Sequence, residues 1–210
     1  MNHVILPGDS IFDNKAYVGN GPDVIAQVRQ RLPAQWQATL GAVDGHVTTD
    51  VSQQLHDLPS DATHLVVSVG GNDALKSIDV LTRSAQSTAD ALIKLANVSE
   101  QFEDDYRRML QAALSYRLPA AVCTIYYPRF PNEVLQRLAV TALTVFNDVI
   151  LRVAFAAGIP LLDLRLICDA EDDYANSIEP SVQGGNKISS AIVRLLTEHD
   201  FSRQRTEIFL

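Results

Sequence analysis

The stretch His3-Val4-Ile5-Leu6-Pro7-Gly8-Asp9-Ser10 decides the fold class of this chain. It opens with a short apolar run that lacks an alternating polar face, which is typical of a strand buried on both sides of a parallel sheet. A proline and a glycine end the run, so a tight turn follows and presents Ser10 directly after it. Ligands bind at the carboxyl ends of strands in such sheets. The serine is therefore expected at the functional edge of a parallel sheet.

Four further apolar runs of the same kind predict strands at Ala38–Val43, His64–Val69, Ala120–Tyr126 and Pro160–Ile167. Helical spacing of apolar residues predicts helices at Pro22–Arg31, Gln101–Tyr116, Leu135–Ala157 and Gly184–Thr197. Strands that alternate with helices indicate one α/β domain with a parallel sheet and right-handed crossovers. We place this domain at residues 1–200.

Two segments have no clear place in the alternation of strands and helices. Residues Ala74–Ser99 form a stretch longer than a loop needs, and we interpret it as helical cover or a lid. Residues 201–210 are treated as a C-terminal tail that packs on the domain or on a second subunit, or is frayed. A homo-oligomer is therefore left open.

Composition narrows the classes of function. The chain has 210 residues, 17 Lys plus Arg and 25 Asp plus Glu, so its formal charge is 17 − 25 = −8. This acidic balance argues against nucleic acid or an anionic membrane as partner. We expect no membrane span, because Asn147 and Asp148 interrupt the apolar stretch Leu138–Ile150. No secretory signal is recognised, and Cys123 and Cys168 are predicted to be buried thiols, so a cytoplasmic location is expected.

The loops after the first three strands carry the most distinctive residues. Ser10 follows the first strand, Gly45 lies in the loop after the second, and Asn72 lies in Gly70-Gly71-Asn72-Asp73 after the third. A serine hydroxyl presented there could attack an acyl carbonyl. The backbone N–H groups of Ser10 and Gly45 and the Asn72 side-chain amide could converge on the oxyanion that forms.

With these blocks, most of the chain resembles the SGNH (GDSL-type) hydrolases. Gly8-Asp9-Ser10-Ile11 is similar to the first family block, Gly45 to the second and Gly70-Gly71-Asn72-Asp73 to the third. The resemblance implies a flavodoxin-like three-layer α/β/α sandwich with a five-stranded parallel sheet in the order 2-1-3-4-5. It also implies an esterase, lipase, thioesterase or deacetylase in which Ser10 is the nucleophile and Ser10, Gly45 and Asn72 form the oxyanion hole.

The fourth block departs from the family. The family pattern is Asp-x-x-His-Pro-Ser, whereas this chain has Asn176 at the aspartate position and Glu179 at the histidine position, before Pro180-Ser181. Glu179 is one candidate base, since burial can raise the pKa of a carboxyl group toward that of imidazole. His46 beside Gly45 is the other candidate, and absence of a base is the third alternative. His3, His56, His64 and His199 are expected far from Ser10.

A substrate pocket is expected beside the nucleophile. We predict that Asp9 contributes to it, together with Tyr126, Tyr127 and Arg129 from the segment after the fourth strand. The acidic loop with Asp169, Glu171, Asp172 and Asp173 is interpreted as a solvated turn, with a divalent cation as the alternative. We predict no cofactor and no resident metal.

These residues together predict a serine hydrolase that acts on a small ester or acyl substrate. A non-catalytic binding module that keeps the oxyanion pocket is one alternative. An acyltransferase is the other, because both enzymes use an acyl-enzyme.

Overall fold

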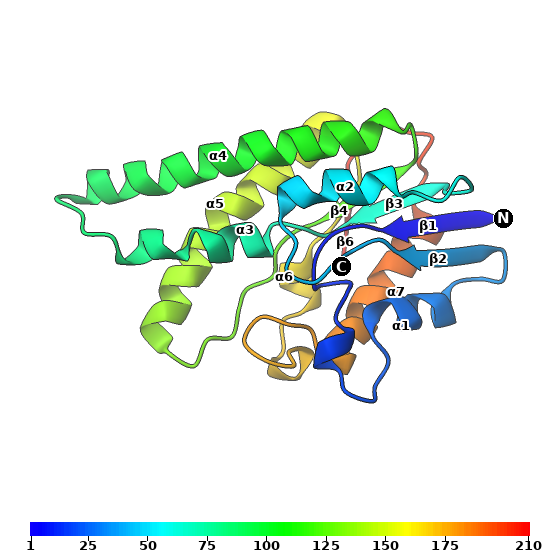
Figure 1. Cartoon of the computed structure of the whole chain (residues 1–210), viewed down its shortest axis with the longest axis horizontal. Coiled ribbons are helices and arrows are strands. Elements are labelled where there is room, and N and C mark those ends of the chain that lie inside the picture. The colour runs from blue at the N-terminus through cyan, green and yellow to red at the C-terminus, as the bar shows by residue number, and fades with distance from the viewer.

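A computed structural model describes all residues, 1–210, and its centre is a parallel sheet between two layers of helices (Figure 1). The sheet has six strands in the order β2-β1-β3-β4-β5-β6, and every pairing is parallel. In the register, Val4 of β1 lies opposite Ala38 of β2 on one side and His64 of β3 on the other. The strands are β1 (Asn2–Leu6), β2 (Trp36–Leu40), β3 (His64–Val67), β4 (Ala120–Cys123), β5 (Leu161–Leu162) and β6 (Ile208–Phe209).

The predicted α/β/α sandwich and the strand order 2-1-3-4-5 are confirmed, with one strand added. The added strand is β6, which the C-terminal tail contributes next to β5: Leu161 N–H donates to the Glu207 carbonyl and Asp163 N–H to the Phe209 carbonyl. The prediction of a fifth strand over Pro160–Ile167 is wrong in its length. The strand stops at Leu162 because the Asp163 side chain accepts from Arg165 N–H and starts the helix α6 (Leu164–Ile167).

Helices cover both faces of the sheet. Helices α1 (Val24–Arg31) and α7 (Val182–Glu198) pack on one face with α6. Helices α2 (Val51–His56), α4 (Thr88–Ser115) and α5 (Glu133–Ala157) pack on the other face. The short 3-10 helices are η1 (Lys15–Tyr17), η2 (Thr48–Asp50), η3 (Ile78–Thr82) and η4 (Glu171–Asp173), and a further short α-helix is α3 (Gly71–Lys76).

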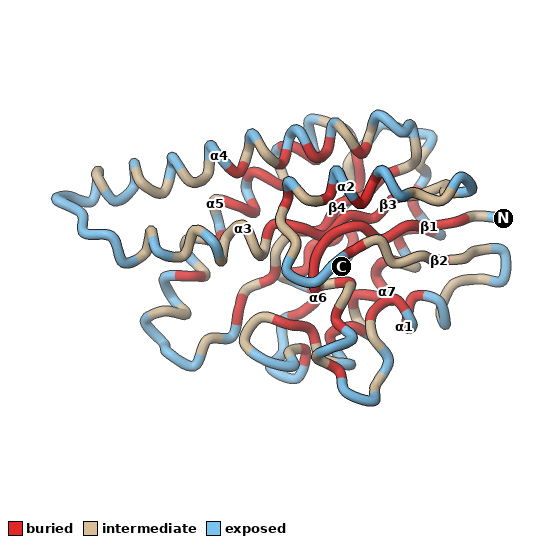
Figure 2. Tube along the Cα trace, in the orientation of Figure 1, coloured by how far each residue is buried: buried red, intermediate tan, exposed pale blue.

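The two-sided cover explains the near-continuous apolar runs. Val4 and Leu6 of β1 belong to the core beneath α1 and α7, whereas Ile5 between them belongs to the core beneath α4 and α5. Successive side chains of a strand point to opposite faces, so a strand covered on both sides needs apolar residues at every position. Figure 2 shows these central strands as the buried part of the chain.

The segment that has no place in the strand–helix alternation is helical. It contains α3, η3 and the first half of α4, which begins at Thr88 rather than at Gln101 and is capped by the Ser87 side chain. In Figure 1 this half of α4 runs beyond the sheet with η3 beneath it, and the first half of α5 lies nearby. The helices therefore build a projection beyond the carboxyl ends of the strands.

Helix α5 is long and apolar enough to cross a membrane by length and composition alone. Its inner face, however, packs in the core against α4 and the sheet through residues that include Phe146, Ile150 and Val153. The core helices of globular proteins pass the same test, so this helix alone does not indicate a span.

Candidate active site

The turn after β1 presents Ser10 at the edge of the sheet. Gly8 has φ +142°, and a Cβ there would lie 1.9 Å from the Ser68 carbonyl oxygen, so only glycine fits. The next residue, Asp9, donates its N–H to the same Ser68 carbonyl at 3.0 Å. The end of β3 thereby holds the turn, and Ser10 follows in a buried position.

The Ser10 hydroxyl has a carboxylate partner. Its Oγ donates to Glu179 Oε1 at 3.1 Å, across 169 residues of sequence. Only 6% of Glu179 is exposed, and its second oxygen, Oε2, is buried without a hydrogen-bond partner. The pKa of Glu179 is raised to about 7: burial is the largest cause, the Ser10 hydrogen bond lowers the pKa, and the charge of Asp44 raises it. A carboxyl group with this pKa can accept a proton near neutral pH much as an imidazole does.

Asn176 holds the backbone of the Glu179 loop and not the Glu179 carboxyl group. Its Oδ1 accepts from the backbone N–H of Ile178 at 2.9 Å and of Glu179 at 3.0 Å. Tyr126 Oη donates to the Ile178 carbonyl at 2.6 Å from the opposite side. A neutral side chain at position 176 adds no negative charge beside Glu179, whereas an aspartate there would disfavour the ionised base.

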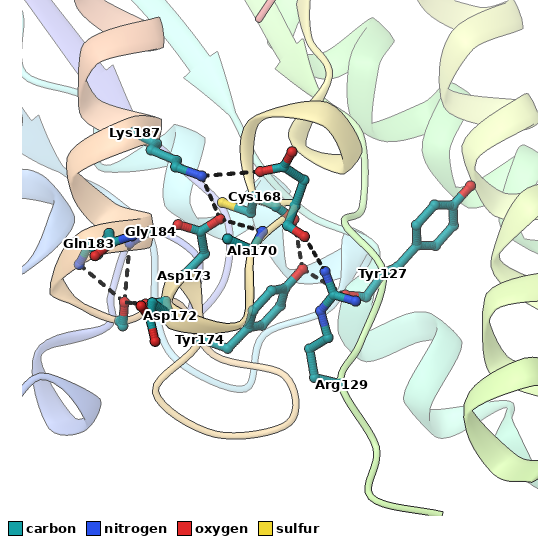
Figure 3. A network of polar contacts seen from close by, with 12 residues as sticks. Tyr127, Arg129, Cys168, Ala170, Asp172, Asp173, Tyr174, Gln183, Gly184 and Lys187 are labelled. Carbon is teal, nitrogen blue, oxygen red and sulfur yellow. Dashed lines mark hydrogen bonds and ion pairs between the residues drawn. The ribbon is translucent and has the colours of Figure 1, made fainter. Parts of the chain in front are cut away.

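The chain that leads into this loop is anchored to α7 by an ion pair between the partly exposed Lys187 and the buried Asp173 (Figure 3). Lys187 Nζ lies 2.7 Å from Asp173 Oδ2 and 3.1 Å from Asp169 Oδ1. Asp173 also accepts from Ala170 N–H at its carboxylate and from Ser181 N–H at its carbonyl. In the acidic loop, Lys187 therefore supplies the positive charge beside Asp169 and Asp173.

The three residues predicted to form the pocket wall after β4 do not share one environment. Tyr126 lines the cleft beside Ser10. Arg129 instead lies over the Tyr174 ring, 5.3 Å from its centroid, and donates to the Asp169 carbonyl (Figure 3). The Tyr127 carbonyl accepts from Tyr174 Oη at 2.8 Å. The structure thus places Tyr127 and Arg129 outside the cleft lining, where they brace the acidic loop.

The three predicted oxyanion donors are all free to donate. The backbone N–H groups of Ser10 and Gly45 have no hydrogen-bond acceptor within the protein. Asn72 Nδ2 donates one hydrogen to the His46 carbonyl at 2.9 Å, which leaves its second hydrogen unused. Asn72 and Ser10 line the same cleft, whereas Gly45 lies in an exposed turn outside the lining with φ +82°.

Asp9 also lines the cleft and is 2% exposed. Its Oδ1 accepts from Ile11 N–H at 3.2 Å. Burial raises the pKa of Asp9 to about 8, with further contributions from the charges of Glu179 and Asp73. Near neutral pH, Asp9 is therefore mainly protonated, so it adds little negative charge beside Glu179.

No histidine forms a hydrogen bond with Ser10 or Glu179. His46 Nδ1 instead lies 3.0 Å from Gln54 Nε2. His3 pairs with Asp61, His199 pairs with Glu207, and His64 packs against Trp36. Of the two base candidates that the sequence offered, Glu179 is the one that contacts the nucleophile.

An apolar cleft extends from Ser10 under the helical projection, and sequence reasoning missed its residues. Most of its wall is hydrophobic and comes from α3, η3, α4 and α5, through residues that include Leu75, Ile78, Leu81, Leu95, Ala139, Leu143 and Phe146. Ser10, Asn72 and Glu179 line its inner end. The apolar residues within 74–99, a segment with no strand to cover, were the available signal.

Comparison with known proteins identifies the family and the fold. A model of the GDSL-like lipase/acylhydrolase family matches residues 7–184, a range that includes Ser10, Gly45, Asn72 and Glu179. A search of curated proteins by sequence finds no match.

Solved structures share the fold at low sequence identity. A lipase from a goat rumen metagenome has a TM-score of 0.73 and 18% identity, with 96% of this chain and 100% of that chain covered. An extracellular lipase from Streptomyces rimosus has a TM-score of 0.67 and 19% identity, over 95% of this chain and 100% of that chain. A lipolytic protein of the G-D-S-L family from Veillonella parvula DSM 2008 has a TM-score of 0.69 and 15% identity, over 95% and 100%.

Proposed function

This chain belongs to the GDSL-like lipase/acylhydrolase family, and on that basis we propose that it is a serine esterase that uses Glu179 as its general base. The family match confirms the resemblance indicated by the Gly-Asp-Ser, Gly45 and Asn72 blocks. The contact that carries the proposal is the hydrogen bond of 3.1 Å from Ser10 Oγ to the buried Glu179 carboxyl group. A nucleophile and a base within hydrogen-bond reach are the minimum that covalent acyl transfer needs.

The proposed reaction begins when Ser10 Oγ attacks the ester carbonyl carbon and its proton passes to Glu179 Oε1. The carbonyl oxygen becomes an oxyanion, which the N–H groups of Ser10 and Gly45 and the free hydrogen of Asn72 Nδ2 stabilise. The carbon–oxygen bond to the alcohol then breaks, and the alcohol leaves with the proton from Glu179.

Water completes the proposed cycle. It loses a proton to Glu179 as it attacks the acyl-enzyme, and the carboxylic acid leaves when the bond to Ser10 Oγ breaks and that oxygen recovers the proton. In this proposal Glu179 works without a second acidic residue, because its carboxyl group bonds only to Ser10 and its Oε2 has no hydrogen-bond partner.

The apolar cleft supports an acyl group longer than that of the small ester expected from the sequence. Its walls offer side chains such as Leu81, Leu95 and Leu143 to a hydrocarbon chain, and about 0.8 kcal/mol is gained for each CH₂ that leaves water. The Glu179 carboxyl group lies at its inner end, and the charge of Asp44 lies close enough to affect Glu179. This arrangement favours neutral over anionic substrates.

Labelling with a fluorophosphonate tests the proposal, because the probe requires an activated serine. We expect labelling of the parent at Ser10 and none in Ser10→Ala. Since only ionised Glu179 can accept the proton, the labelling rate should rise about tenfold per pH unit and level off above about pH 7. The rate of p-nitrophenyl ester hydrolysis should increase from acetate to octanoate.

Other results would point to the alternatives. An unlabelled parent that still binds the octanoate ester would indicate a binding module without catalysis. A labelled parent that passes its acyl group to an added alcohol faster than to water would indicate an acyltransferase. Labelling of Ser10 that is independent of pH between 5 and 8 would exclude Glu179 as the base.

A further inference from the structure

The Gln54 side chain links the loops that carry the oxyanion donors. Gln54 lies on α2 and is 8% exposed. Its Oε1 accepts from Gly8 N–H at 2.7 Å, and its Nε2 donates to the Gly8 carbonyl at 2.8 Å. The carboxamide therefore pairs with both polar groups of one peptide residue, two positions before Ser10.

The same amide reaches a second loop. Gln54 Nε2 lies 3.0 Å from His46 Nδ1, and the His46 carbonyl accepts from Asn72 Nδ2 at 2.9 Å. One chain of hydrogen bonds thus runs from Gly8 through Gln54 and His46 to Asn72. The donors of the proposed oxyanion hole are Ser10, Gly45 and Asn72, and each of them belongs to this chain or adjoins it in sequence within two residues.

No other side chain of this size can make these contacts. A carboxamide offers two N–H donors and one carbonyl acceptor, and all of them are used here. An amide nitrogen donates and does not accept, so at this contact His46 Nδ1 is the acceptor. In this arrangement His46 is a hydrogen-bond acceptor behind the residues that line the cleft.

We propose that Gln54 is the positioning residue of the oxyanion hole and that His46 acts as its acceptor rather than as a base. The inference rests on the proposed esterase function. Neither residue lines the cleft, so both act through the placement of Ser10 and Asn72 and not through contact with substrate. A displacement of about 1 Å of such groups can lower turnover about 100-fold.

Substitution of Gln54 tests the positioning role. Gln54→Met keeps the length of the side chain and removes all three hydrogen bonds, whereas Gln54→Glu keeps the acceptor for Gly8 and loses both donors. We expect each variant to lower kcat for an octanoate ester about 10- to 100-fold with KM within about threefold of the parent. Gln53→Met on the exposed side of α2 is the surface control.

A second control separates catalysis from stability. Gln27 is a buried glutamine, 2% exposed, that donates to the carbonyls of Pro22 and Val182 and forms no hydrogen bond with the loops of Gly8, His46 and Asn72. Gln27→Met should lower the melting temperature about as much as Gln54→Met while kcat stays within about threefold. If folded Gln54→Met and Gln54→Glu both keep the parent kcat while Ser10→Ala is inactive, the positioning role is refuted and the esterase proposal stands.

Position 46 distinguishes an acceptor from a base. Asparagine can place its Oδ1 near the position of Nδ1, so His46→Asn should keep kcat within about fivefold of the parent, whereas His46→Leu should lower it about tenfold or more. Loss of activity in both variants to the level of Ser10→Ala would contradict the inference, because it would make His46 the base. A parent without Ser10-dependent turnover would refute both the inference and the proposed function.

Discussion

The two sides of Ser10 are built on different physical principles. On one side, the loops after β1, β2 and β3 offer backbone N–H groups and the amide of Asn72, held by uncharged hydrogen bonds. On the other side, the loop before α7 offers one carboxyl group, Glu179, whose pKa depends on its burial. Amide groups donate at any pH, whereas a carboxyl group accepts a proton only when ionised. The oxyanion donors themselves therefore do not titrate, whereas the proposed base does.

The same two sides differ in how closely they follow the family pattern. The oxyanion side keeps the Gly-Asp-Ser, Gly45 and Asn72 pattern of the family that the chain resembles. The base side replaces the histidine and aspartate of that pattern with Glu179 and Asn176. The two replacements are physically consistent, because a carboxylate base next to an aspartate would be driven toward its protonated form.

The largest effect is expected when the base side is broken. Glu179→Gln preserves the shape of the side chain and removes its ability to accept a proton, so kcat for an octanoate ester should fall about 10²- to 10⁴-fold. Steady-state kinetics at pH 8, where the parent is ionised, measures the loss. Glu171→Gln, an exposed carboxyl group of the same acidic segment, should behave like the parent. Turnover of Glu179→Gln within threefold of the parent would remove Glu179 from the reaction.

A smaller loss is expected when the oxyanion side is broken. Asn72→Ala removes one donor of three, which typically costs about 10²- to 10³-fold in kcat with little change in KM. The logarithmic slope of the remaining activity against pH should match that of the parent, because Asn72 does not titrate. Asn97→Ala on the exposed face of α4 is the matched control. Parent-like turnover in Asn72→Ala would show that the amide does not reach the oxyanion.

The smallest effect concerns stability. Folding raises the pKa of Glu179 from 4.5 to about 7, so between these pH values the folded state binds more protons than the unfolded state. The free energy of unfolding then falls as pH rises through this window, by about 3 kcal/mol at most. The Glu179→Gln variant has no carboxyl group at this position, so its free energy of unfolding does not fall in this way as pH rises. Its melting temperature should be close to that of the parent at pH 4 and several °C higher at pH 8.

Thermal unfolding at both pH values, followed by circular dichroism, checks the expectation. Asp9, whose pKa is raised in the same direction, is present in both proteins and its contribution largely cancels. An equal difference in melting temperature at pH 4 and pH 8 would show that the folded-state pKa of Glu179 is not raised.

Much of the fold could be predicted from local patterns, because a strand buried on both faces needs a run of consecutive apolar residues. Val4, Ile5 and Leu6 each have an apolar environment, and the run they form predicts a central parallel strand. The tail strand β6 has no such run: it consists of two residues, and Ile208 is half exposed. Its pairing depends on the open edge that β5 offers, which local sequence does not reveal.

Some features of the candidate site could likewise be predicted from the sequence, and others could not. The sequence could place Ser10 and Asn72 at one edge of the sheet, since each follows a predicted parallel strand directly and the carboxyl ends of parallel strands share one edge. It could not show that Arg129 lies over Tyr174 or that Asn176 binds backbone, because those contacts depend on the path of the acidic loop. Gln54 was missed for a related reason: its partners are Gly8 and His46, and its own neighbours in α2 carry no signal.

By itself, the sequence determined the parallel sheet, the glycine turn that presents Ser10 and a short set of candidate site residues. These follow from hydrophobic periodicity and backbone sterics, which act within a few residues. The tertiary structure alone decided that Glu179 is buried against Ser10, that its pKa moves to about 7 and that an apolar cleft opens beside it. The physical reason is that a pKa and a cleft depend on which distant segments exclude water from one place, and that is settled only when the whole chain has packed.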